Sequence, residues 1–124
     1  MDPIANMLTI IRNGYMANLA VVFCKKSKVK TEIAKLLAKH GFIKSVTVDN
    51  NDLKIELAYY NKQPVITQIK RVSKPGLRVY QSIGQLRKRR SRIAIKILST
   101  PQGIMTDYEA IAKNTGGEVI AVVY

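Results

Sequence analysis

The chain has 124 residues, enough for one compact domain or two very small ones. Hydrophobic residues make up 47% of it, which allows a packed core and excludes wholesale disorder. Twenty-one Lys and Arg against eight Asp and Glu leave a net charge of +13. So large an excess favours a nucleic-acid partner, with an acidic membrane surface as the alternative.

The first element in chain order is a helix near the N-terminus. Asp2 suits the N-cap, and Pro3 suits the first helical position, where its missing N–H costs nothing. The apolar residues 4, 7, 8 and 11 recur on one helix face, and Gly14 is expected to end the helix in a left-handed conformation. A short strand is expected over residues 19–24.

A second helix is predicted to begin after Ser27 and to end at Gly41, with apolar residues 29, 33, 36 and 37 on its core face. Its opening is basic, because Lys28 and Lys30 follow two further lysines. Helix N-termini attract phosphate, so these lysines are candidate phosphate contacts. Residues 45–48 and 53–57 predict two hairpin strands joined by a polar turn.

The second half of the chain is more basic than the first. No acidic residue lies between Leu57 and Thr106, and residues 59–62 are the predicted boundary between subdomains 1–62 and 63–124. Strands are expected over residues 65–72, 77–80, 93–98 and 118–124, with a turn at 73–76. Thr106 and Glu109 form a predicted capping box that opens a short helix to about Lys113.

Catalytic and metal-binding patterns are weak in this sequence. The single cysteine, Cys24, lies in an apolar run and is expected to be a buried thiol. The single histidine, His40, is expected to be a helix cap or a surface residue, and neither a carboxylate pair nor a phosphate-binding glycine loop is present. We therefore expect no enzyme activity, cofactor, metal or small-molecule substrate. With no apolar run long enough to span a bilayer and no signal-peptide pattern, an intracellular soluble protein is expected.

Two segments are candidate RNA contacts on composition alone. The basic cluster at residues 86–92 includes Arg87, Arg89 and Arg90, which would bind phosphate or else form a solvated face. The loop from Ser99 to Gly103 offers hydroxyl, amide and backbone groups that could bind base edges and 2′-hydroxyls, or else is an ordinary surface turn.

Five blocks in register resemble the bacterial-type family of small-subunit ribosomal protein eight. They are DPIANMLTIIRN (2–13), SKPGLRVY (73–80), Ser99-Thr100 with Gly103, MTD with EA (105–110), and GGEV (116–119). The resemblance implies an α+β fold of two small, tightly packed α/β subdomains, with helices on short mixed or antiparallel sheets. The C-terminal subdomain, 63–124, would be basic, mainly β and RNA-binding.

The resemblance also implies a function and its partners. The chain would be a structural constituent of the small ribosomal subunit that binds the central domain of small-subunit ribosomal RNA and stabilises its fold during assembly. Neighbouring small-subunit ribosomal proteins would be its other partners, with no membrane involved. A free RNA- or DNA-binding regulator is the alternative, and a peripheral membrane protein is a third reading.

Carried over by position, the resemblance predicts a set of RNA-binding residues. The loop and turn residues are expected at the RNA, the ring of Tyr80 is a candidate for stacking or backbone contact, and lysines of both halves would bind phosphate. This set comprises Ser99, Thr100, Gly103, Gly116, Gly117, Glu118, Tyr80, Lys74, Lys28 and Lys30, to which the charge pattern adds Arg87, Arg89 and Arg90.

Two positions depart from the family pattern. Pro101 stands where the family has a second serine, which removes a hydroxyl and a backbone donor and stiffens the loop. The basic residues 86–92 replace a glycine-rich approach to the strand. Both departures suggest a divergent lineage, and the Ile-, Lys- and Asn-heavy composition favours an organelle ribosome, mitochondrial or plastid, over a bacterial one.

Overall fold

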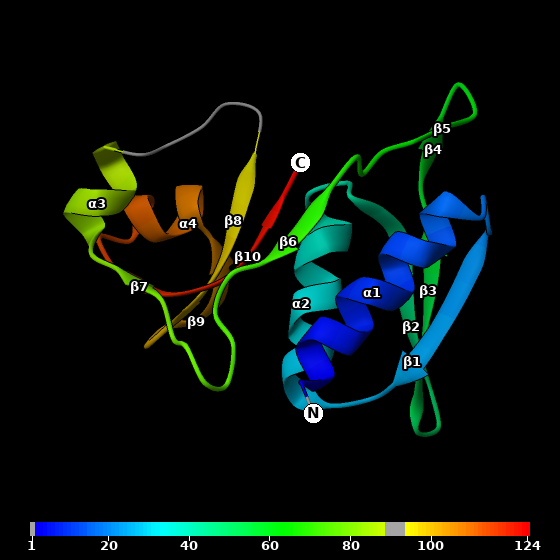
Figure 1. The fold of residues 1–124 in the computed structure, drawn as a ribbon, viewed down its shortest axis with the longest axis horizontal. Helices are drawn as coiled ribbons and strands as arrows, with labels where there is room; N and C mark the ends of the chain where they lie inside the picture. The colour runs from blue at the N-terminus through cyan, green and yellow to red at the C-terminus, as the bar shows by residue number, and fades with distance from the viewer. Residues whose placement is uncertain (1, 89–93) are drawn as a thin grey trace. The chain divides into compact units, whose positions relative to one another are not determined.

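The structure is a computed structural model that describes residues 2–88 and 94–124. The chain forms two compact units, Met1–Thr67 (unit 1) and Gln68–Tyr124 (unit 2), each built from helices and antiparallel sheets (Figure 1). The predicted α+β class is therefore confirmed, while the predicted subdomain boundary at residue 62 stays a prediction.

Unit 1 is built on a three-stranded antiparallel sheet in the order β1-β3-β2. The strands are β1 (Val21–Lys25), β2 (Ile43–Asp49) and β3 (Asp52–Leu57). Alternate residues of the central strand β3 point into the core, where Leu53, Ile55 and Leu57 are buried. The sheet follows the predicted hairpin closely, because apolar and polar residues alternate in β3.

Two helices, α1 (Pro3–Met16) and α2 (Lys28–Lys39), cover the buried face of this sheet (Figure 1). The predicted starts are confirmed: the side chain of Asp2 accepts the N–H of Ile4, and the side chain of Ser27 accepts the N–H of Lys30. One prediction is wrong on the core face of α2, where Val29 is 40% exposed.

Helices α1 and α2 end in the same way, with a left-handed residue directly after the C-cap. At the end of α1 this residue is Asn18, whose φ is 54°, and the next N–H, that of Leu19, donates to the Gly14 carbonyl oxygen. Gly41 does the same for α2, as predicted. Gly14 was expected to end α1, but the helix continues past it to Met16. Close packing requires glycine at position 14, because a Cβ there would collide with Val22 of the adjacent strand.

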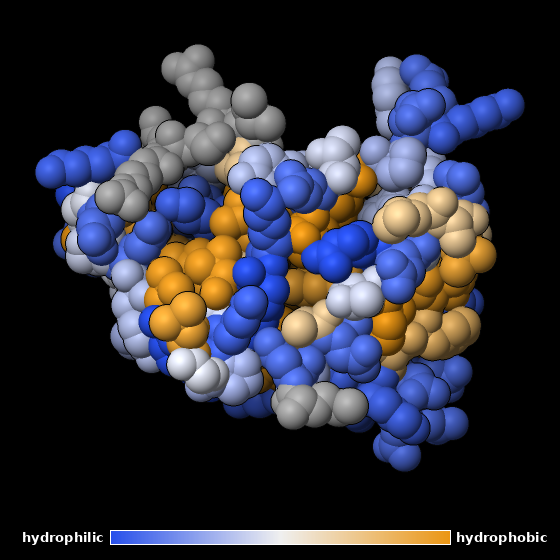
Figure 2. Space-filling model, viewed as in Figure 1, coloured by the Kyte–Doolittle hydropathy of each residue, from blue (hydrophilic) through white to orange (hydrophobic). Residues whose placement is uncertain are grey.

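Unit 1 also contains a short hairpin outside the main sheet. It pairs β4 (Tyr59–Tyr60) with β5 (Gln63–Pro64) and extends beyond the end of β3 (Figure 1). Hydrophilic side chains dominate its projecting tip (Figure 2). Neither strand was predicted, since Tyr59–Tyr60 and Gln63–Pro64 are each too short to show periodicity.

Unit 2 is built on a larger antiparallel sheet in the order β6-β10-β8-β9, with β7 also paired to β10. Its strands are β6 (Ile69–Arg71), β7 (Tyr80–Gln81), β8 (Ile95–Thr100), β9 (Gly103–Thr106) and β10 (Gly117–Val123). The predicted strands at 65–72 and 77–80 are shorter than expected. Leu77 is 66% exposed because it pairs with Lys74 across the turn between them instead of entering the sheet.

Two short helices, α3 (Ile83–Lys88) and α4 (Asp107–Ala112), complete unit 2. The capping box predicted for α4 is confirmed by reciprocal bonds between Thr106 and Glu109. Helix α3 was not predicted. Both helices pack on the sheet, and buried residues of the helices and strands form the core of the unit: Leu86, Leu98, Met105, Ala110 and Val119.

Candidate nucleic-acid interface

Most of the predicted loop and turn residues meet where three strands of unit 2 join. Glu118 of β10 lies opposite Tyr80 of β7 on one side and Ser99 of β8 on the other. Residues that are 19 and more positions apart in sequence therefore become neighbours through sheet register alone.

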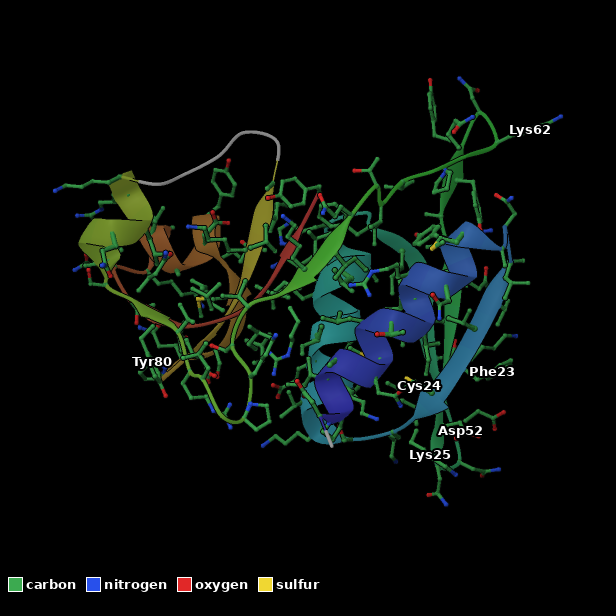
Figure 3. The ribbon with its side chains drawn as sticks, viewed as in Figure 1. Phe23, Cys24, Lys25, Asp52, Lys62 and Tyr80 are labelled. Carbon is green, nitrogen blue, oxygen red and sulfur yellow. The ribbon has the colours of Figure 1, made fainter. Side chains whose placement is uncertain are left out.

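This junction surrounds an open pocket of about 540 Å³, which we call the junction pocket. Its wall combines hydroxyl, amide and carboxylate side chains with the aromatic ring of Tyr80, which is 67% exposed (Figure 3). The lining residues are Tyr80, Gln81, Ser82, Gln85, Ser99, Thr100, Pro101, Gly116, Gly117 and Glu118. Six of the predicted site residues thus share one pocket, with hydrogen-bonding groups beside a flat aromatic surface.

The two glycines of this pocket are required by close backbone packing. A Cβ on Gly117 would collide with the Ser99 carbonyl oxygen, and a Cβ on Gly116 would collide with the Gln81 carbonyl oxygen. Only glycine lets β10 run this close to the ends of β7 and β8. Both glycines therefore keep the strand junction that forms the pocket wall closely packed.

The loop predicted between Ser99 and Gly103 is instead a tight turn joining β8 to β9. The Thr100 hydroxyl donates to the Gly103 carbonyl oxygen at 2.8 Å and accepts the Gln102 N–H at 3.1 Å. Pro101 occupies the first turn position, where its fixed φ is favourable, and Gly103 has φ of 118°. The departure at Pro101 is therefore accommodated by the backbone.

The hydroxyls of Ser99 and Thr100 differ in availability. The Thr100 hydroxyl donates its proton within the turn, whereas the Ser99 side chain makes no hydrogen bond within the described part of the chain. Because an unsatisfied hydroxyl can still donate and accept, Ser99 is the better placed of the two to bind a ligand.

A buried serine fixes the segment that leads to Tyr80. Ser73 is 0% exposed, and its hydroxyl accepts the Val79 N–H at 2.8 Å and donates to the Val79 carbonyl oxygen at 3.2 Å. The Ser73 N–H donates to the Val119 carbonyl oxygen at 3.1 Å. This clamp holds the turn that carries the exposed Lys74 against β10, so Lys74 and Tyr80 belong to one ordered surface.

The carboxylate of the junction pocket is covered by an arginine. Arg78 Nη1 lies 3.0 Å from Glu118 Oε2, with the Arg78 side chain 50% exposed and that of Glu118 17% exposed. Glu118 can thus accept hydrogen bonds from a ligand without presenting an uncompensated negative charge to phosphates. Sequence reasoning missed Arg78, although Glu118 was the one acidic residue in the predicted site and needed a cation beside it.

The remaining predicted cations are placed differently from one another. Arg87 lies in the last turn of α3 and donates from Nη2 to Asn114 Oδ1 at 3.1 Å, and its side chain is exposed. Arg89 and Arg90 lie outside the described residues.

The two lysines predicted in unit 1 have opposite orientations. Lys28 is exposed at the first position of α2, whereas Lys30 is only 5% exposed and donates from Nζ to the Lys25 carbonyl oxygen at 3.1 Å. The Lys30 ammonium group is bound inside the fold, because position 30 falls on the buried face of α2. A phosphate contact from this helix is therefore supported for Lys28 and not for Lys30.

The groups relevant to catalysis lie in ordinary structural positions. Cys24 is buried, and burial raises the pKa of its thiol, with the charge of Lys30 acting in the opposite direction. His40 is the C-cap of α2. Nowhere in residues 2–88 and 94–124 do three or more His, Cys, Asp or Glu side chains gather as they would around a metal ion. None of the helices described there has the length and apolar character needed to cross a bilayer.

Comparison with known proteins gives the family of the chain. A family model described as ribosomal protein S8 matches residues 2–124. The small ribosomal subunit protein uS8 of Polaromonas naphthalenivorans (strain CJ2) is 48% identical over 98% of this chain and 96% of its own length. The proteins of the same name from Rhodospirillum centenum and Pseudomonas aeruginosa are 43% and 44% identical, each over 99% of this chain and 97% of their own length. The chain therefore belongs to the ribosomal protein S8 family.

Proposed function

We propose that the junction pocket of unit 2 and exposed cations of both units bind the central domain of small-subunit ribosomal RNA. As a member of its family, the chain is a structural, non-enzymatic protein of the small ribosomal subunit. By binding early it stabilises the local RNA fold during assembly, and its other partners are neighbouring small-subunit proteins.

One observation carries the proposal for this surface. The junction pocket gathers the exposed ring of Tyr80, the hydroxyl of Ser99, which has no partner among the described residues, and the charge-compensated carboxylate of Glu118 on one strand junction. RNA recognition uses these groups: rings stack on bases, while hydroxyls and carboxylates bind base edges and 2′-hydroxyls. Rigid strands hold such groups at fixed angles, which favours selective binding.

Affinity and selectivity are assigned to different residues. The exposed cations Lys74, Arg87 and Lys28 neutralise phosphates, which gives affinity that falls steeply with salt and does not depend on base sequence. The same role is proposed for Arg89 and Arg90. The pocket residues, with Gly103, Gly116 and Gly117 shaping the backbone, supply the selectivity.

The test compares two hydroxyl removals on two RNAs. We expect Ser99→Ala to weaken binding to the central-domain RNA by about 1–3 kcal/mol and to leave binding to a random RNA of equal length unchanged. Thr100→Ala, unlike Ser99→Ala, should lower the free energy of unfolding by about 0.5–1.5 kcal/mol, because the Thr100 hydroxyl forms hydrogen bonds within the turn. The exposed Thr47 of β2, changed to Ala, is the matched control.

Two results would count against the proposal. Equal losses on both RNAs for Ser99→Ala would remove the selectivity assigned to the pocket. A chain that binds RNA but does not sediment with small subunits would instead be a free regulator.

The compartment is a separate and finer proposal. Composition favours an organelle ribosome, but the relatives compared are bacterial and lend that preference no support. Detection of the chain in small subunits purified from an organelle fraction, and not from the remaining cytoplasm, would favour the organelle.

A further inference from the structure

The β4–β5 hairpin of unit 1 is anchored at its base by two tyrosines. The Tyr59 hydroxyl donates to the Leu19 carbonyl oxygen at 2.6 Å, and its ring meets that of Tyr15 edge-on with centroids 5.5 Å apart. The Tyr15 hydroxyl donates to the Phe42 carbonyl oxygen at 2.6 Å and accepts the Ala58 N–H at 3.1 Å. A two-stranded hairpin has little stability alone, so these contacts hold it in one conformation.

The tip of the hairpin has two consecutive left-handed residues. The φ angles of Asn61 and Lys62 are 51° and 66°. Two-residue hairpin turns favour this backbone, with Asn common at the first position and Gly at the second. A lysine at the second position is strained where glycine would not be, and backbone strain of this kind gathers at functional sites.

The hairpin presents one aromatic ring and one cation to solvent. Tyr60 alternates with the anchored Tyr59 and is 75% exposed, and Lys62 extends away from the tip (Figure 3). Lys62 has no ion pair within the described residues. The two acidic side chains of the adjacent strand β3, Asp52 and Glu56, each already face another lysine, at N–O distances of 4.0 and 3.7 Å.

We propose that this hairpin is a second RNA contact, in which Tyr60 stacks on an unpaired base and Lys62 binds a neighbouring phosphate. A ring beside a cation is the pair of groups that single-stranded RNA engages, through base stacking and phosphate neutralisation. RNA is favoured over an acidic protein because unit 1 has ten Lys and Arg against five Asp and Glu, a charge that suits a polyanion. The inference rests on the proposed function but concerns residues outside the junction pocket.

The affinity test uses the full chain and a transcript of the complete small-subunit ribosomal RNA. Tyr60→Ala should weaken binding by about tenfold, as expected for loss of one stacked base, whereas Tyr60→Phe keeps the ring and should bind like wild type. Lys62→Gly should lower the slope of log K against log salt by about 0.7–0.9, one phosphate contact, without lowering the melting temperature. Lys54→Gln removes an equal charge from the exposed β3 position and should affect binding less.

A tethered probe gives a second, independent readout. Because Cys24 is buried, Lys62→Cys provides an accessible thiol at the tip for an iron chelate that cleaves nearby RNA. We expect cleavage to cluster at an unpaired or irregular RNA segment. The exposed Asn50→Cys, at the left-handed turn between β2 and β3, is the matched control and should give weaker cleavage of that segment.

The outcomes separate this inference from the proposed function. Failure of the wild-type chain to bind the RNA would contradict the proposed function itself. Wild-type binding with unchanged affinity for both Tyr60→Ala and Lys62→Gly, and no tip cleavage, would overturn the hairpin contact alone. Unchanged affinity for RNA with lost incorporation into subunits would assign the hairpin to a protein partner and overturn the RNA assignment.

Discussion

Unit 1 and unit 2 use their polar side chains in different ways. In unit 1, Lys30 is buried on a backbone carbonyl, and the Tyr15 hydroxyl both donates and accepts within the fold. In unit 2, the junction pocket leaves Ser99 without a partner in the described chain and Tyr80 largely exposed. Positive charge in a sequence therefore does not show which cations the fold leaves exposed, and the structure separates the buried Lys30 from the polar groups that stay available in the junction pocket.

The largest expected effect concerns a glycine in each unit. Gly117→Ala should lower the free energy of unfolding by about 1–3 kcal/mol, because the new Cβ meets the backbone carbonyl of Ser99. Gly14→Ala should cost less, because it meets the side chains of Val22 and Leu57 and gains about 1 kcal/mol of helix propensity. Urea unfolding measures the free energy of unfolding of both variants, and an equal or greater loss for Gly14→Ala than for Gly117→Ala would contradict this expectation.

A smaller effect should separate the two lysines of α2. Lys28→Gln should reduce the salt-dependence slope of RNA binding by about 0.7–0.9, since an exposed phosphate contact is lost. Lys30→Met should leave that slope unchanged and alter stability by less than about 1 kcal/mol, because one hydrogen bond is exchanged for apolar burial. A reduced slope for Lys30→Met would return Lys30 to the interface.

The smallest expected effect is on pH dependence in unit 2. Asp107 is 1% exposed, and burial raises the pKa of its carboxyl despite hydrogen bonds from backbone N–H groups, including that of Lys96. With the pKa higher in the folded state, its contribution to stability is fully present below the unfolded pKa and is lost as pH rises through the folded one. Wild type should therefore lose stability relative to Asp107→Asn between acidic and neutral pH, and parallel profiles would contradict this assignment.

Much of the fold follows from local sequence signals. Alternation in residues 53–57, the cap at Ser27 and the capping box at Thr106 each correspond to an observed element. Helix α3, which was not predicted, also has a local sequence signal, because Ser82 and Gln85 have capping-box spacing. The side chain of each accepts the backbone N–H of the other. Gly14 misled because the same residue type serves both helix ends and close packing.

The junction pocket was less predictable than the fold. Family motifs gave most of its residues, but the register that places Glu118 between Tyr80 and Ser99 depends on long-range strand pairing. The burial of Lys30 and the pairing of Arg78 with Glu118 likewise depend on three-dimensional packing, which charge patterns in a sequence do not encode.

Chemical-shift mapping of the isotope-labelled chain, on titration with central-domain ribosomal RNA, tests directly whether the junction pocket binds that RNA. We predict that the largest backbone perturbations within unit 2 fall at Tyr80, at Ser99 and across Gly116–Glu118, and that Ser99→Ala needs a higher concentration of that RNA to produce them. Perturbations in unit 2 confined to residues outside the junction pocket, with these positions unchanged at saturation, would contradict it.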